Sequence, residues 1–172
     1  MFDDLIRLSP NRTQLIKNLK PVAETEIIAQ RAKYPECPDA YWEFLIRFGY
    51  GKIKEENEPK NFPAHFEFTN ELISAVDEYY KDRMIYDNGA KGDILLFGFD
   101  SLGTGFGFDS GDHYAVVRVD EFRIVEKLNI DFENFFLGLL VCYPDFPFSY
   151  ASGEWSVETG EVYRINQKKS DS

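Results

Sequence analysis

The sequence predicts an α+β domain in which a central antiparallel β-sheet, a meander, is flanked by α-helices. Between residues 92 and 120, three apolar segments alternate with short clusters of Asp, Ser and Gly. This pattern is typical of consecutive antiparallel strands joined by tight turns. On both sides of it, apolar residues recur every three or four positions, as in helices that bury one face. The 172 residues of the chain match the size of one domain.

The N-terminal third is predicted to be helical. A short apolar stripe ends at Pro21, so residues 1–20 are expected to contain a small helix or an ordered arm. Residues 23–33 have helical spacing, with acidic residues on the exposed side. A further helix is expected from Pro38, because proline is tolerated in the first helical turn. Gly49 then supplies a left-handed stop.

The next part of the chain is predicted to contain strand, loop and helix. Residues 52–60 are charged and form an exposed loop, with a short strand at Ile53. Residues 65–68 alternate between polar and apolar side chains and predict a strand. After an N-cap at Thr69 or Asn70, apolar and aromatic residues recur at helical spacing, which predicts an amphipathic helix over residues 70–80.

The meander is expected to be the centre of the fold. Its three strands are predicted at residues 94–99, 104–108 and 114–119. The segments between them, residues 100–103 and 109–112, have the Asp, Ser and Gly residues that tight turns require.

Three elements are expected after the meander. Residues 122–125 predict a fourth strand, and Asp131 is placed to cap a helix that is apolar enough to lie against the sheet. Residues 155–165 have the pattern of a hairpin around the turn Thr159-Gly160. We expect residues 143–172 to be an appendage of the single domain and not a second domain.

Charge is the most informative feature of the composition. The chain has 30 acidic and 19 basic residues, a net charge of −11, so it repels phosphate backbones and is not expected to bind nucleic acid. Residues 61–122 hold 12 of the acidic residues and 4 of the basic ones. A solvated surface that aids solubility explains this excess. A docking face for a basic partner explains it as well.

The candidate docking residues fall into two groups. The helix–loop group consists of Glu78, Tyr79, Tyr80, Asp82, Tyr86 and Asp87. The turn group consists of Asp100, Asp109 and Asp112. The two turns lie at opposite ends of the strand at 104–108 and so cannot all contact one partner, and we therefore favour the helix–loop group, with its tyrosines as anchors. Tyr79 and Tyr80 also complete an apolar stripe, so the alternative is that at least one of them is part of the core.

The sequence shows no set of residues that is typical of catalysis or metal binding. Residues 103–107, Gly-Thr-Gly-Phe-Gly, look like a phosphate loop, but no helix follows and aspartates flank them. Residues 109–112 have two carboxylates, which predicts a turn and not a calcium site. His65 and His113 lack partners at metal-ligand spacing, and no serine or cysteine has a recognisable base. We expect no enzymatic activity, no cofactor and no metal.

The expected location is the cytoplasm, without membrane association. The N-terminus carries acidic residues where a secretory signal has basic ones, and no apolar run reaches ~18 residues. Cys37 and Cys142 match no metal or redox motif and are expected to be reduced thiols. A disulfide between them is the alternative.

Several stretches resemble the SUKH superfamily. Pro-Asp-Ala-Tyr-Trp-Glu-Phe-Leu at residues 38–45 leads into Phe-Gly-Tyr-Gly. A hydrophobic strand, a glycine-bearing turn and a Gly-Phe-Asp ending follow, and then a second strand and the helix that begins Asp-Phe-Glu-Asn-Phe-Phe-Leu. Order and spacing match over about residues 21–142, which leaves residues 1–20 as an N-terminal arm and 143–172 as a hairpin appendage. The chain has Cys37-Pro38 where the family usually has Leu-Pro.

The resemblance implies an α+β domain with no catalytic residues. Its bacterial members are best known as immunity proteins that neutralise toxins of polymorphic secretion systems, many of them nucleases. We therefore expect an immunity protein whose partner is a cognate toxin domain, and a basic nuclease would complement the acidity of this chain. Fungal relatives regulate cell-wall synthesis, so a non-catalytic regulatory scaffold is the alternative, and a hydrolase is the third. The sequence leaves the oligomeric state open.

Overall fold

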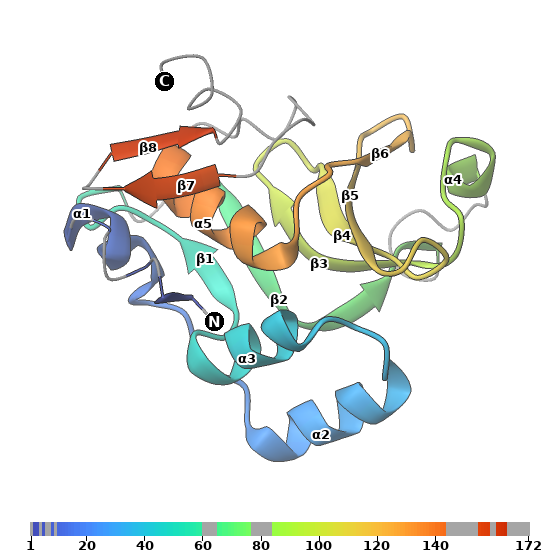
Figure 1. Ribbon diagram of the computed structural model, residues 1–172, viewed down its shortest axis with the longest axis horizontal. Helices are drawn as coiled ribbons and strands as arrows, with labels where there is room; N and C mark the ends of the chain where they lie inside the picture. Colours follow the sequence, from blue (N-terminus) through green and yellow to red (C-terminus); the bar gives the residue numbers. More distant parts are fainter. Residues whose placement is uncertain are drawn as a thin grey trace.

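The fold is an antiparallel sheet with helices on both faces (Figure 1). The computed structural model describes residues 2, 3, 5, 8, 10–59, 65–76, 84–143, 155–158 and 161–164. The six strands of the main sheet are β1 Gly51–Ile53, β2 Phe66–Ser74, β3 Ile94–Asp100, β4 Gly105–Asp109, β5 Ala115–Val119 and β6 Val125–Lys127. Each strand pairs with the next one along the chain. The predicted α+β class is confirmed, and the three-stranded meander is the centre of a larger sheet.

The helices of the described part of the chain are mostly short. They are α1 Pro10–Thr13, the 3-10 helix η2 Gln14–Ile16, α2 Glu24–Lys33, α3 Asp39–Arg47, α4 Met84–Asp87 and α5 Phe132–Cys142. The expected helical character of the N-terminal third is confirmed, as is the N-cap of α5, where the Asp131 carboxylate accepts the backbone N–H of Asn134. The hairpin is also present, as β7 Trp155–Glu158 and β8 Glu161–Arg164.

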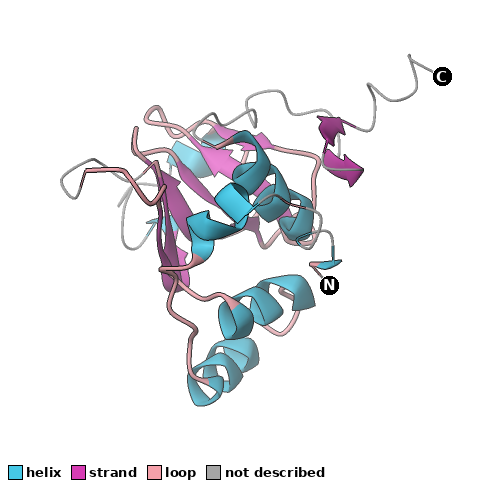
Figure 2. Ribbon diagram, turned by 90° about the vertical axis from the view of Figure 1, so that its left-hand side faces the viewer, coloured by secondary structure: helices cyan, strands magenta, loops and turns pink. Residues whose placement is uncertain are grey.

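The core consists of two apolar layers, one on each face of the sheet. Figure 2 shows most of the helices on one side of the strands, and on this side α3 and α5 pack their aromatic side chains against the sheet. Phe44 of α3 lies 4.6 Å from Phe68 of β2, and Phe132 of α5 lies 5.1 Å from Phe97 of β3, measured between ring centroids. Such rings bury large apolar areas, and an edge-to-face contact such as that of Phe132 with Phe97 adds about 0.5–1.5 kcal/mol.

A smaller apolar cluster covers the opposite face of the sheet. Ile85 of α4 is fully buried in it, together with side chains from β3 and β5. Phe99, Gly105, Val119 and Val125 are paired in register across four neighbouring strands. Three of these residues, Phe99, Val119 and Val125, belong to the same cluster as Ile85. The short helix α4, which the sequence did not predict, therefore covers this face near one end of the strands.

The helix predicted over residues 70–80 is wrong over residues 70–74, which belong to a strand. Residues 66–74 form strand β2, and residues 77–80 lie outside the described residues. Pairing with β3 shifts register between Phe68 and Ile73. Between these two positions β2 advances five residues and β3 advances two, so β2 has three extra residues. An odd number of extra residues breaks the two-residue alternation of a strand. The apolar positions after the bulge therefore mimic helical spacing.

The fourth strand of the meander begins later than expected. The sequence placed it at residues 122–125, but β6 begins at Val125. The Asp120 carboxylate accepts the backbone N–H groups of Phe122 and Ile124, both at 2.9 Å. These two bonds hold residues 120–124 as a turn, because an aspartate side chain readily accepts from the backbone two residues further on.

Candidate protein-docking surface

The predicted helix–loop group is only partly described by the structure. Glu78, Tyr79, Tyr80 and Asp82 lie outside the described residues. Tyr86 and Asp87 belong to α4. The hydroxyl of Tyr86 donates to the Asp93 carboxylate, and its ring packs against the apolar cluster under α4. Tyr86 thus has an intramolecular role, whereas Asp87 is exposed to solvent.

Asp109, one of the predicted docking residues, is buried. It is 2% exposed and ends strand β4. Its two carboxylate oxygens accept the backbone N–H groups of Lys91, Gly92 and Gly111 at 2.8, 2.8 and 2.9 Å. Buried polar groups require such partners, so this carboxylate joins the chain before β3 to the β4–β5 turn. Its oxygens do not face the surface, and we leave Asp109 out of the docking surface.

Asp112 and Asp100 lie at opposite ends of the sheet, as the sequence predicted for their turns. Asp112 forms ion pairs with Lys127 and Lys91, at 3.2 and 3.4 Å. The hydrogen bond from Lys127, with the charge of that ammonium group, lowers the pKa of the Asp112 carboxyl. At the other end, the Asp100 carboxylate accepts the backbone N–H groups of Leu102 and Thr104.

The acidic segment at residues 61–122 has its negative charge at the surface. The exposed acidic residues of this segment that the structure describes are Glu67, Glu71, Asp87, Asp93 and Glu121. The structure describes two basic residues of this segment, and each of them is paired with a carboxylate other than these five. Lys91 pairs with Asp112, and the Arg118 guanidinium lies 2.6 Å from the Glu126 carboxylate. The negative field of the exposed acids is therefore not neutralised by these two bases. Glu71 and Asp93 line a cavity next to the end of α2, whereas Glu67, Asp87 and Glu121 lie toward the end of the sheet with the β3–β4 and β5–β6 turns. We call Glu67, Asp87 and Glu121 the acidic surface.

Four large apolar side chains on α4 and on the β3–β4 and β5–β6 turns are exposed, and none of them was predicted to be part of a docking face. Leu102 is 85% exposed, Phe122 67%, Met84 52% and Ile124 51%. The sequence contains a pattern that could have identified Leu102 and Phe122 as exposed. In Asp100-Ser-Leu and in Asp120-Glu-Phe, an apolar residue stands two positions after an aspartate. Aspartate at that position favours a turn whose tip is exposed.

Two of the surface cavities among the described residues lie beside the sheet. One, of about 470 Å³, lies between the β4–β5 turn and the start of α5 and is lined by His113 and Tyr114 among others. The other, of about 490 Å³, lies between the end of α2 and strands β2 and β3 and is lined by Tyr34 and Ser74 among others. Neither brings a serine or cysteine next to a histidine, and no group of three or more His, Cys, Asp or Glu in the described residues could hold a metal ion.

Neither Cys37 nor Cys142 is in a disulfide, as expected. Cys37 is buried against the aromatic core, and this desolvation raises the pKa of its thiol. A thiol without access to solvent and without a stabilised thiolate is a poor nucleophile. We expect Cys37 to react with a thiol reagent only when the protein unfolds, which can be checked by counting modified thiols with and without urea.

Searches of family models, of curated proteins and of solved structures find no match to this chain. In the residues that the structure describes, no helix has the length and apolar character needed to cross a membrane. The conclusions about function therefore depend on the surface of the molecule and on the resemblance described above.

Proposed function

We propose that this protein is a cytoplasmic immunity protein that binds a basic toxin domain, most simply a nuclease, and blocks it without catalysis. The observation that carries the proposal is the acidic surface of a chain with a net charge of −11. A nuclease needs a basic surface to hold phosphate groups. An acidic protein that covers this surface meets complementary charge and excludes the substrate.

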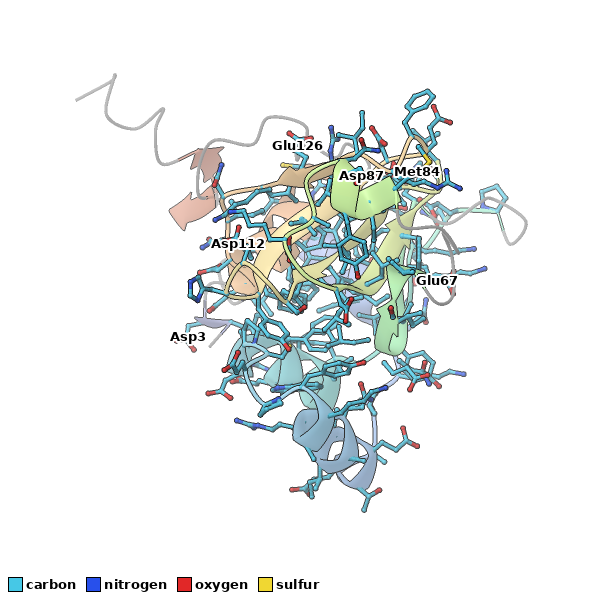
Figure 3. The ribbon with its side chains drawn as sticks, turned by 90° about the vertical axis from the view of Figure 1, so that its right-hand side faces the viewer. Asp3, Glu67, Met84, Asp87, Asp112 and Glu126 are labelled. Atoms are coloured by element: carbon cyan, nitrogen blue, oxygen red, sulfur yellow. The ribbon has the colours of Figure 1, made fainter. Side chains whose placement is uncertain are left out.

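The acidic surface is suited to fast recognition of such a partner. In Figure 3, Asp87 on α4 and Glu67 on β2 are both visible on one side of the molecule, and Asp112 lies further along the strands. Exposed like charges on one side produce a field that speeds the association of an oppositely charged protein. The effect depends on ionic strength, because the Debye length is ~8–10 Å near physiological salt.

The test is a charge reversal with a matched control. We expect Glu67→Lys, Asp87→Lys and Glu121→Lys together to slow association with the toxin domain encoded beside the gene of this chain by about tenfold or more at low salt. The control reverses Glu24, Glu26 and Glu36, three exposed acids on α2 and the loop after it. Both variants have the same net charge, so a difference between them reports where the partner docks. Association rates are measured by stopped flow over a salt series.

Three results would contradict the proposal. One is that the wild-type protein does not bind the toxin domain, or does not protect cells that express it. Another is an association rate that is insensitive to salt, since screening must slow a reaction that charge has accelerated. The third is that both variants bind like the wild type, in which case the acidity is a solvated surface.

A further inference from the structure

Three of the exposed apolar side chains, Met84, Phe122 and Ile124, belong to two neighbouring segments, α4 and the β5–β6 turn. Met84 begins α4, and its carbonyl accepts the N–H of Asn88. The carbonyl of Asn88 in turn accepts the N–H of Val125, at 3.0 Å, and Ile124 precedes Val125 in the chain. This pair of bonds joins α4 to the end of the β5–β6 turn. In Figure 3, Met84 lies on the side of α4 away from Asp112, toward the end of the sheet where this turn lies.

The turn holds its apolar residues outward by its own hydrogen bonds. The Asp120 carboxylate accepts both Phe122 N–H and Ile124 N–H, and the Arg123 guanidinium donates to the carbonyl of Glu121 at 3.2 Å. Phe122 and Ile124 are therefore presented on a fixed backbone. A preorganised side chain loses less conformational entropy when a partner covers it. Side chains held on a fixed backbone in this way are suited to act as anchors in a protein interface.

Acidic residues lie on the segments that carry the apolar group and on the neighbouring β3–β4 turn. Over α4, the β3–β4 turn and the β5–β6 turn, the described acids are Asp87, Asp100, Asp120 and Glu121, and the single base is Arg123. An apolar centre within a charged rim is the usual arrangement of a protein interface, in which a few central side chains contribute most of the binding energy.

We infer that Met84, Phe122 and Ile124 are the apolar centre of the surface that binds the basic toxin domain. This inference rests on the proposed function and adds the anchor residues to it. The acidic rim selects the occupant: a second copy of this chain would bring two acidic rims together, and an anionic lipid surface would be repelled in the same way. A basic protein with an apolar pocket is complementary to both the acidic rim and the apolar centre.

Charge and apolar contact are expected to control different rate constants. Rim charges steer the encounter and mainly set the association rate. Buried anchors hold the formed complex, so their loss mainly raises the dissociation rate. The acidic surface and the apolar centre can therefore be tested separately with the same toxin domain.

The experiment truncates the anchors. We expect Phe122→Ala with Ile124→Ala to raise the dissociation rate of the toxin domain at least about 30-fold, and Met84→Ala to raise it by a smaller factor. Association rate and its salt dependence should stay within about twofold of wild type. The matched control is Ile28→Ala, which removes an apolar side chain of similar exposure, 63%, from α2. All truncated side chains are exposed, so thermal unfolding should show that each variant folds.

The outcomes separate the inference from the proposed function. If the double variant dissociates like wild type while the charge reversal slows association, the inference is overturned and the proposed function stands. If wild type does not bind the toxin domain, the proposed function fails and the inference fails with it. If the double variant instead abolishes self-association of the wild type, seen by ultracentrifugation, the occupant is a second copy and the inference is overturned.

Discussion

Gly49→Ala is expected to lower the free energy of unfolding by about 3 kcal/mol or more. Gly49 follows α3 with φ at 90°, and its N–H donates to the carbonyl of Phe44. A Cβ at this position would lie 1.7 Å from the carbonyl oxygen of Lys20. That oxygen cannot move freely, because Lys20 and Tyr50 exchange two backbone hydrogen bonds at 2.9 and 3.0 Å. The alanine must therefore break this bridge or displace the end of α3.

Gly103→Ala is the matched control for this prediction. Gly103 has φ at 83°, similar to Gly49, but a Cβ there would meet no atom within 4 Å. It should cost only the strain of a left-handed alanine, about 1 kcal/mol. Urea denaturation of both variants gives the comparison. Equal losses for the two variants would show that the collision with Lys20 does not determine the effect.

Asp109→Asn is expected to lower the free energy of unfolding by about 2–4 kcal/mol. One carboxylate oxygen accepts from Gly92 and Gly111, and the other accepts from Lys91. An asparagine keeps the size of the side chain but has only one acceptor oxygen. Its NH₂ group must then face a backbone N–H in a buried site, which leaves donors without an acceptor.

Asp100→Asn provides the comparison for Asp109. The Asp100 carboxylate accepts both of its backbone N–H groups with a single oxygen, Oδ1, in a half-buried turn. An asparagine oxygen can replace that acceptor, so the loss should be about 1 kcal/mol or less. Thermal and urea unfolding measure both variants. A loss for Asp109→Asn no larger than that for Asp100→Asn would contradict the structural role of the buried carboxylate.

The sequence was sufficient to predict elements whose signals are local. The N-cap at Asp131, the left-handed position at Gly49 and the strands of the meander depend on residues within a few positions of one another. Strand β2 was assigned to a helix because its pattern depends on a bulge against β3. Pairing between strands is decided by tertiary contacts, which can override local spacing.

The negative charge of the candidate surface could be predicted from the sequence, but the residues that are exposed on it could not. The acidic excess at residues 61–122 can be counted in the sequence, whereas burial of Asp109 depends on N–H groups of Lys91 and Gly92, which lie 18 and 17 positions earlier. The exposed group at Met84 and Ile124 is formed by a contact between α4 and the β5–β6 turn. No local pattern encodes that contact.

The short outer strands of the six-stranded sheet limit how a partner can recognise this fold. Each edge strand, β1 and β6, has three residues, and Lys52 and Lys127 are exposed on them. A strand from another protein that added to such an edge would gain few backbone hydrogen bonds and would meet charged side chains. Recognition by β-augmentation is therefore disfavoured at this sheet, and specificity has to come from side chains. Homologous proteins with the same backbone could then change partners by substitution at the surface while the sheet stays the same.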